Sequence, residues 1–557
     1  MNRKPRPNLG ARWRTLAAVV LDAITIGAMG LGLSAAYNLT KIRIDGVSPW
    51  AADLYFSFPP PRHLTYQFWS ISYYPWTDVC GNASDAFVLS HGGLIYQAAV
   101  TNHPPGMAQV VATAMWLAGF SRAIPGIETA TAAWLVGSLA SVLFQLTCVF
   151  IGLRILGFSR TAAAVLSLVP CTYAAFAYDF AQPMSETLIS SLFVLVPILV
   201  YKMLFSEQPR DRLASAVMLG GPVTLLCLDI GLTAAPANAF LALACLAVCL
   251  REFARDRSAV TTALLIDHRF HLAYAMVAIV VISWIGTVSA GDVLFWTVDV
   301  NRGFIISPAE KIAGSFAAHF GDLFGRDDIV GSRYPHLLIA LVLLVLAIER
   351  TARRNQQPRP VVPLLLFVAM ILVTAVLTQW RENYGIKSIT IFGLTVGTAY
   401  LALYQLVRDR TPLPGLLLAP IFGFALLQVN FLVALGTYGA ARAPRLPALD
   451  AAKVCRFGET TGCRCIQVTV DGPQLFLLND MRSCPSRFAS AAFIIDRHPA
   501  LRQMMVDDVK SPDMAFWTYS DELMRENGVP SEAVRYLRSQ ATCFSISNGE
   551  AICVAGS

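Results

Sequence analysis

Apolar runs of about 20 residues recur along most of this chain, and each is long enough to cross the hydrocarbon core of a bilayer as a helix. Only 14% of the residues are charged and 55% are hydrophobic, a balance that soluble proteins rarely show. The sequence therefore predicts an all-α polytopic membrane protein with about eleven transmembrane helices. The expected helices lie near residues 15–37, 129–153, 161–178, 187–206, 213–230, 233–250, 271–289, 336–349, 361–379, 388–407 and 413–438.

The positions of lysine and arginine predict the orientation of these helices, because cytoplasmic loops carry an excess of both residues. We treat the stretch 106–120 as a helix that lies in or dips into the outer interface, and the basic loops then share one side with the basic N-terminus. The expected location is the plasma (inner) membrane of a bacterium, with the N-terminus in the cytoplasm and the C-terminal domain outside. The net charge of +7 then reflects anchoring in the membrane rather than binding of nucleic acid.

Two domains are expected. Residues 1–439 form a transmembrane module with long outer loops at 38–127 and 290–335, and residues 440–557 form a small α+β extracytoplasmic domain. The elements predicted in the second domain are three strands and one helix, near 466–470, 475–478, 491–495 and 531–539.

The cysteines of the second domain predict disulfide bonds, because disulfides persist outside the cytoplasm. Six of them could form up to three bridges, and their pairing cannot be read from the sequence. They are Cys455, Cys463, Cys465, Cys484, Cys543 and Cys553. The alternative is a zinc site at Cys463 and Cys465, although no partner with the usual zinc spacing follows them.

The first outer loop concentrates the residues that could carry chemistry. It holds two acids, Asp78 and Asp85, then a Gly-rich turn that ends at Tyr96, and then His103 followed by two prolines. A carboxylate can act as the base for an attacking hydroxyl, and a cation can hold the charge of a phosphate leaving group. The loop therefore favours transfer of a group from a phosphate carrier.

This order of acid, Gly turn and His-Pro-Pro resembles the first outward-facing loop of GT-C glycosyltransferases. The aminoarabinose, O-mannosyl and arabinofuranosyl transferases of that class take sugars from polyprenyl-phosphate carriers. The resemblance implies a GT-C-like fold and a catalytic acid before the turn, for which Asp78 fits the spacing better than Asp85. It also implies that His103 lies near the donor phosphate. The structural alternatives are that an acid caps the helix after Ser84 and that His103 satisfies loop backbone.

Further candidates lie in the other outer segments. Glu186 precedes an apolar run where the same resemblance implies a second acid, which would orient the acceptor or help to hold a cation. The alternative is an acid that interacts with the dipole of its helix. The remaining candidate ligands of the donor phosphate are Arg302, Arg381, Tyr384 and Lys387. Anchoring of helices at the interface is the alternative for the last three.

The expected activity is transfer of a sugar from a polyprenyl-phosphate donor to a glycan or lipid acceptor of the cell envelope, with inversion at the anomeric carbon. The expected partners are this donor, the acceptor and membrane lipids, and not nucleic acid. No cofactor is predicted with certainty and no metal ligand is assigned, but Mg²⁺ or Mn²⁺ is left open. The alternatives are a transporter or lipid flippase and a non-catalytic partner in envelope assembly.

Overall fold

The structure is a computed structural model that describes part of the chain. The described residues are 17, 20–29, 85–86, 88–90, 92–96, 103–117, 129–172, 185–289, 291, 293–300, 333–356, 358, 360–378, 389–408, 453–455, 461–468, 484, 498–526, 528–547 and 550–555. Several predicted features lie outside them, namely Asp78, Arg302, Arg381, Tyr384, Lys387, the apolar run 413–438 and the strands at 475–478 and 491–495.

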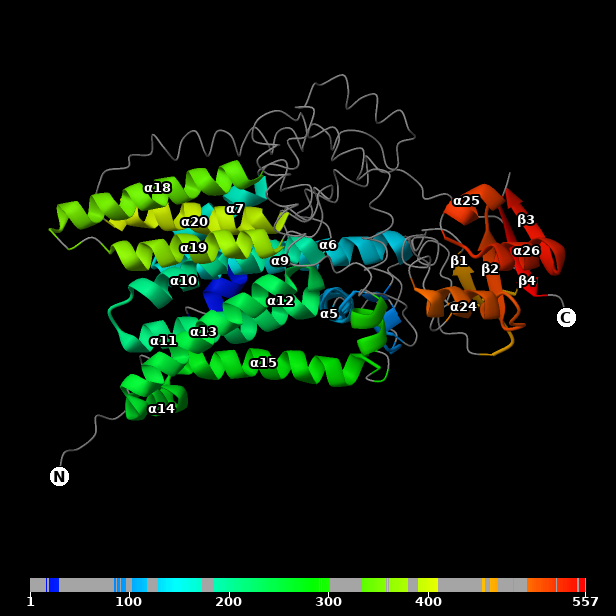
Figure 1. Cartoon of the computed structure of the whole chain (residues 1–557), viewed down its shortest axis with the longest axis horizontal. Coiled ribbons are helices and arrows are strands. Elements are labelled where there is room, and N and C mark those ends of the chain that lie inside the picture. The colour runs from blue at the N-terminus through cyan, green and yellow to red at the C-terminus, as the bar shows by residue number, and fades with distance from the viewer. Residues whose placement is uncertain are drawn as a thin grey trace, which may run out of the picture.

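Most of the described residues form helices that run side by side in a bundle (Figure 1). The first helices of the bundle are α5 (Gly106–Leu117), α6 (Thr129–Leu156), α7 (Arg160–Thr172), α9 (Ser185–Phe193), α10 (Leu195–Phe205) and α11 (Pro209–Met218). Those in the middle of the chain are η1 (Leu219–Val223), α12 (Thr224–Ile230), η2 (Leu232–Ala234), α13 (Ala235–Arg255), α14 (Arg257–Ile266), α15 (His268–Thr287) and η3 (Phe295–Asp299). The last are α18 (Arg333–Arg354), α19 (Val361–Thr378) and α20 (Ile389–Arg408).

Five helical segments in the described part of the chain are long and apolar enough to cross a membrane. They are Ser185–Phe205, Pro209–Ile230, Ala235–Arg255, His268–Thr287 and Val361–Thr378. On α15 large apolar side chains are exposed, and Ile285 reaches 79% exposure. Such a surface suits contact with lipid, which agrees with the predicted polytopic membrane protein. The count of eleven helices and the orientation in the membrane remain predictions.

The core of the bundle depends on close helix packing at small residues. A Cβ atom at Gly393 or Gly397 of α20 would collide with the backbone carbonyl of Ser190 or Val194, respectively. These glycines are four residues apart, so both lie on the face of α20 that meets α9 and the start of α10. Small residues at this spacing let helix backbones approach closely in a membrane.

An ionic network joins α11, α13 and α15 where α14 connects the last two. Asp267 is fully buried and accepts hydrogen bonds from Arg210 at 2.6 Å and from Arg269 at 2.8 Å. Arg212 makes a two-pronged pair with the buried Glu252, at 2.9 and 3.1 Å. Removal of one partner from such a pair would leave a buried charge uncompensated, so the network fixes this end of the bundle.

The C-terminal part folds as a small α+β unit beyond the opposite end of the bundle (Figure 1). Its sheet has the strand order β1-β2-β4-β3, with β1 and β2 parallel and the other pairs antiparallel. The elements are β1 (Cys465–Val468), α24 (Pro499–Asp508), β2 (Met514–Thr518), α25 (Asp521–Glu526), α26 (Ser531–Ser539), β3 (Ala541–Ser547) and β4 (Glu550–Ala555). The predicted helix over 531–539 is confirmed, and β1 covers the described part of the first predicted strand. The domain boundary at 439 remains a prediction.

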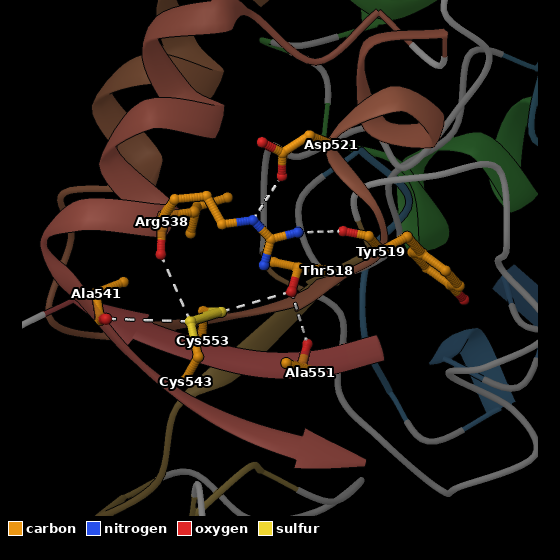
Figure 2. The surroundings of a disulfide bond; sticks show 9 residues. Thr518, Tyr519, Asp521, Arg538, Ala541, Cys543, Ala551 and Cys553 are labelled. Atoms are coloured by element: carbon orange, nitrogen blue, oxygen red, sulfur yellow. Dashed lines mark hydrogen bonds and ion pairs between the residues drawn. A yellow bond between two sulfur atoms is a disulfide. The ribbon is translucent and has the colours of Figure 1, made fainter. Parts of the chain in front are cut away.

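Three disulfide bonds use the six cysteines that the sequence singled out. The pairs are Cys455–Cys463, Cys465–Cys484 and Cys543–Cys553. The alternative of a zinc site at Cys463 and Cys465 is wrong, because each of these sulfurs is already bonded to another cysteine. Figure 2 shows the third bridge, which links β3 to β4 beside Thr518.

Candidate functional site

The start of α5 lies at the end of the bundle that faces the C-terminal sheet (Figure 1). Before it come His103, Pro104 and Pro105, and both prolines are buried. Proline lacks a backbone N–H and has a fixed φ, so it suits the entry into a helix, where the first N–H groups have no helical partner. His103 therefore lies at the start of a stiff segment that leads into α5.

Tyr96 holds this segment from the side of the Gly turn. Its ring is 1% exposed, and its hydroxyl donates a hydrogen bond to the backbone carbonyl of His103 at 2.8 Å. Tyr96 also has a φ of 68°, in the left-handed region that bulky residues rarely occupy. Such a backbone persists only where the surroundings fix it, and it is often found at functional sites.

The Gly turn is hydrogen-bonded to the end of α15. Ile95 donates its N–H to the carbonyl of Thr287 at 2.9 Å, and Ser289 donates to the carbonyl of Ile95 at 3.2 Å. Gln109 on α5 donates its side-chain amide to the hydroxyl of Thr287 at 2.8 Å. Thus the Gly turn, α5 and α15 form one packed unit.

Asp229 belongs to the same unit, although sequence reasoning did not select it as a site residue. It is 5% exposed in the last turn of α12, and its Oδ1 accepts the indole N–H of Trp284 at 2.5 Å. Its Oδ2 faces Gly106, where an added Cβ would lie only 2.5 Å away. The sequence feature that could have indicated Asp229 is an acid within an apolar run. Burial of such a residue in a membrane costs free energy, so it is usually kept for a function. Its partners could not be inferred, because Trp284 comes from another helix.

Two carboxylates act on Tyr96. Burial raises the pKa of the Tyr96 hydroxyl far above its usual range, and the negative charges of Asp85 and Asp229 raise this pKa further. The hydroxyl therefore remains a donor at every physiological pH. Asp85 itself is half-buried, and the described residues 85–86 and 88–90 that precede the turn are helical. Of the residues that the sequence selected, His103 is thus bonded to Tyr96 through its backbone carbonyl, and Asp85 acts on the same tyrosine through its charge.

Glu186, the second acid that the sequence selected, also lies within the described residues. It lies in the first turn of α9, is 5% exposed and accepts a hydrogen bond from the hydroxyl of Ser185 at 2.8 Å. Because α12 packs against both α9 and α5, the start of α9 belongs to the same neighbourhood of helices as the Tyr96 unit. An acid in the first turn of a helix also interacts favourably with the helix dipole, as the structural alternative for Glu186 predicts.

The C-terminal domain contacts this unit through α24. Leu501 and Met504 pack with Tyr96 and Trp296 in one apolar cluster. His498 meets the ring of Phe295 edge to face, with 5.6 Å between the ring centres. The residues that surround His103 are therefore covered in part by the C-terminal domain.

The other sequence-selected residues cannot be placed here. Asp78, Arg302, Arg381, Tyr384 and Lys387 lie outside the described residues. Within the described ranges no three or more histidine, cysteine, aspartate or glutamate side chains gather in a way that could hold a metal ion.

Comparison with known proteins gives only distant likenesses. No family model and no curated protein matches the chain. ArnT from Cupriavidus metallidurans in the apo state is 12% identical with a TM-score of 0.43, over 86% of this chain and 93% of that one. The Archaeoglobus fulgidus oligosaccharyltransferase in the apo form is 10% identical with a TM-score of 0.37, over 95% and 74%. The same enzyme tethered to an acceptor peptide is 12% identical with a TM-score of 0.32, over 96% and 74%. With TM-scores below 0.5, these likenesses decide neither the function nor the site of this chain.

Proposed function

We propose that this chain is a membrane glycosyltransferase of the GT-C class, which transfers a sugar from a polyprenyl-phosphate donor to a glycan or lipid acceptor of the cell envelope. The observation that supports the proposal is the bond from the buried Tyr96 to the backbone of His103, which fixes this loop at one end of an apolar helical bundle. Tyr96 donates to the carbonyl of His103, and the charge of Asp85 acts on its hydroxyl. His103 and Asp85 both belong to the loop for which the sequence predicts the chemistry.

The proposed reaction is a single displacement at the anomeric carbon. A hydroxyl of the acceptor forms the new C–O bond from the face opposite the phosphate, and the bond between the anomeric carbon and the phosphate oxygen breaks. The polyprenyl phosphate leaves with the electron pair, and the sugar is inverted. A carboxylate takes the proton of the hydroxyl, because the hydroxyl has a high pKa until it attacks. Asp78 is the first candidate for this base and Asp85 the second.

The leaving phosphate needs no proton, but its charge must be held. We assign this role to His103, and with it to Arg302, Arg381, Tyr384 and Lys387. In this proposal Glu186 orients the acceptor or helps to hold a divalent cation. In the same proposal the C-terminal domain helps to bind the acceptor, and the packing of α24 on the cluster of Tyr96 and Trp296 supports this role.

The test uses the full chain in lipid nanodiscs with a panel of radiolabelled polyprenyl-phosphate sugars, and delipidated envelope extract as acceptor. Asp78→Asn and Asp85→Asn are compared with wild type, and Glu207→Gln serves as control because Glu207 is an exposed acid in the α10–α11 connection. We expect wild type and the control to transfer sugar, and one aspartate variant to lose at least about 100-fold in rate.

Near-normal transfer by both aspartate variants would overturn the assignment of the base. Turnover of none of the donors, together with movement of a labelled lipid between leaflets, would instead favour the flippase alternative.

A further inference from the structure

We propose that Asp229 is a positioning residue, which together with Trp284 fixes the start of α5 and thereby the place of His103. This inference rests on the proposed function, in which His103 binds the donor phosphate, and it adds two residues that the sequence did not assign. It is carried by three contacts that connect α12, α15 and α5.

The first contact joins two helices. Trp284 of α15 donates its indole N–H to Oδ1 of Asp229 at 2.5 Å. A hydrogen bond to a charged acceptor is stronger than a neutral one, and removal of the donor leaves a buried carboxylate oxygen unsatisfied. Asp229 is 5% exposed, so water has little access to replace the indole. The rotamer of the carboxylate is therefore held by Trp284.

The second contact joins Asp229 to the first residue of α5. A Cβ atom at Gly106 would lie 2.5 Å from Oδ2 and 2.7 Å from the backbone carbonyl oxygen of Asp229. The backbone of Gly106 thus lies directly on the aspartate, and no larger residue fits between them. A carboxylate at this place also interacts favourably with the positive end of the α5 dipole.

The third contact reaches His103. Only Pro104 and Pro105 separate His103 from Gly106, and the rings of both prolines fix φ, so little freedom remains between the two residues. From the other side Tyr96 donates to the carbonyl of His103 at 2.8 Å. The backbone of His103 is therefore held at two points, by Tyr96 and by the contact of Gly106 with Asp229.

Asp229 acts through this contact and not as a ligand of the donor. Oδ1 of Asp229 accepts the indole N–H of Trp284, and its Oδ2 faces Gly106. The negative charge of this carboxylate would also repel the negative phosphate of a donor. The expected effect of its loss is therefore a displaced or mobile His103, with lower affinity for the phosphate.

The first experiment measures backbone hydrogen exchange of the full chain in nanodiscs, in peptides that cover residues 92–117. Trp284→Phe removes the donor and keeps a ring, Asp229→Ala removes the carboxylate, and Asp229→Asn keeps an acceptor oxygen for the indole. Trp116→Phe is the matched control, because Trp116 lies on α5 and is 71% exposed.

We expect Trp284→Phe and Asp229→Ala to raise exchange about tenfold in α5 from Gln109 onward, as loss of a charged hydrogen bond implies. Gln109 is the reference because its N–H donates to the carbonyl of Pro105 at 2.9 Å. Asp229→Asn should raise exchange less, and Trp116→Phe should not change it. Wild-type exchange in Trp284→Phe would overturn the proposal.

The second experiment measures binding of decaprenyl monophosphate to His103→Gln, Trp284→Phe and the double variant. If Trp284 acts through His103, each single variant should lose about tenfold in affinity and the double variant should lose no more than His103→Gln alone. Fully additive losses would overturn the positioning role.

Unchanged binding by His103→Gln has a different meaning. That result would reject the phosphate role of His103 in the proposed function. The exchange data would still decide whether Asp229 and Trp284 fix the start of α5, so failure of the positioning role and failure of the proposed function are distinguishable.

Discussion

The hydroxyl of Tyr96 donates a hydrogen bond to the backbone carbonyl of His103 at 2.8 Å. This bond joins the end of the Gly turn to the segment that leads into α5. Tyr96 is almost fully buried and His103 is half-buried, so removal of the hydroxyl would break a bond at the edge of the packed unit.

Tyr96→Phe is therefore expected to destabilise the folded chain by about 1 kcal/mol, the typical net contribution of one hydrogen bond. Scanning fluorimetry of the purified chain in detergent would measure the change. Tyr274→Phe is the control, because Tyr274 on α15 is 49% exposed. Equal unfolding temperatures of the two variants would show that the hydroxyl does not support His103.

Gly106→Ala should destabilise the chain strongly, because the new Cβ would collide with both the side chain and the backbone of Asp229. Overpacking of this kind costs about 1–3 kcal/mol. Gly286→Ala on α15 has no atom within 4 Å of the added Cβ and should be neutral or stabilising by up to about 1 kcal/mol. Thermal unfolding of both variants would test the pair, and a Gly106→Ala protein as stable as Gly286→Ala would contradict the close contact.

Acid should weaken the end of the bundle that contains Asp267. Burial alone would raise the pKa of Asp267, but hydrogen bonds from Arg269 and Arg210 outweigh burial and hold this pKa well below its usual range. The pKa is depressed in the folded state, so the stabilisation is present above the unfolded value of about 4 and is lost as the pH falls below it.

Asp267→Asn should cost about 1–2 kcal/mol at neutral pH, because its charged hydrogen bonds are weakened while Arg210 and Arg269 stay partly exposed to solvent. The variant should also lack this acid-dependent part of the stability. Unfolding measured between pH 7 and about pH 3 would test the prediction, with Glu207→Gln as an exposed control. An acid dependence that is the same in Asp267→Asn and wild type would show that another group is responsible.

The bridge between Cys543 and Cys553 should stabilise the C-terminal sheet and leave the helical bundle unaffected. The two residues face each other across β3 and β4, and Thr518 Oγ1 lies 3.5 Å from the sulfur of Cys553 (Figure 2). The double replacement by serine should cost about 3 kcal/mol.

Limited proteolysis would show whether the loss is confined to the sheet, with Cys249→Ala on α13 as the control. Cleavage within α13 or α15 of the double serine variant, absent from wild type, would mean that the sheet also supports the bundle. That result would indicate that the sheet supports the bundle through α24, which packs on the cluster around Tyr96.

The sequence by itself determined that long apolar helices form, because length and apolar character are local properties, and the five described segments that could cross a membrane overlap predicted runs. It also predicted the helix over 531–539 and singled out the six disulfide cysteines. The site roles of Asp85, His103 and Glu186 stay predictions. The pairing of Cys465 with Cys484 and not with its neighbour Cys463 was decided by tertiary structure. So was the site around Asp229, because its partners come from α5 and α15, and Trp284 is 55 positions away. Local sequence patterns specify the secondary structure that each segment can form. Contacts such as that of Asp229 with Trp284 depend instead on how the helices pack, and this packing results from many weak interactions across the whole bundle.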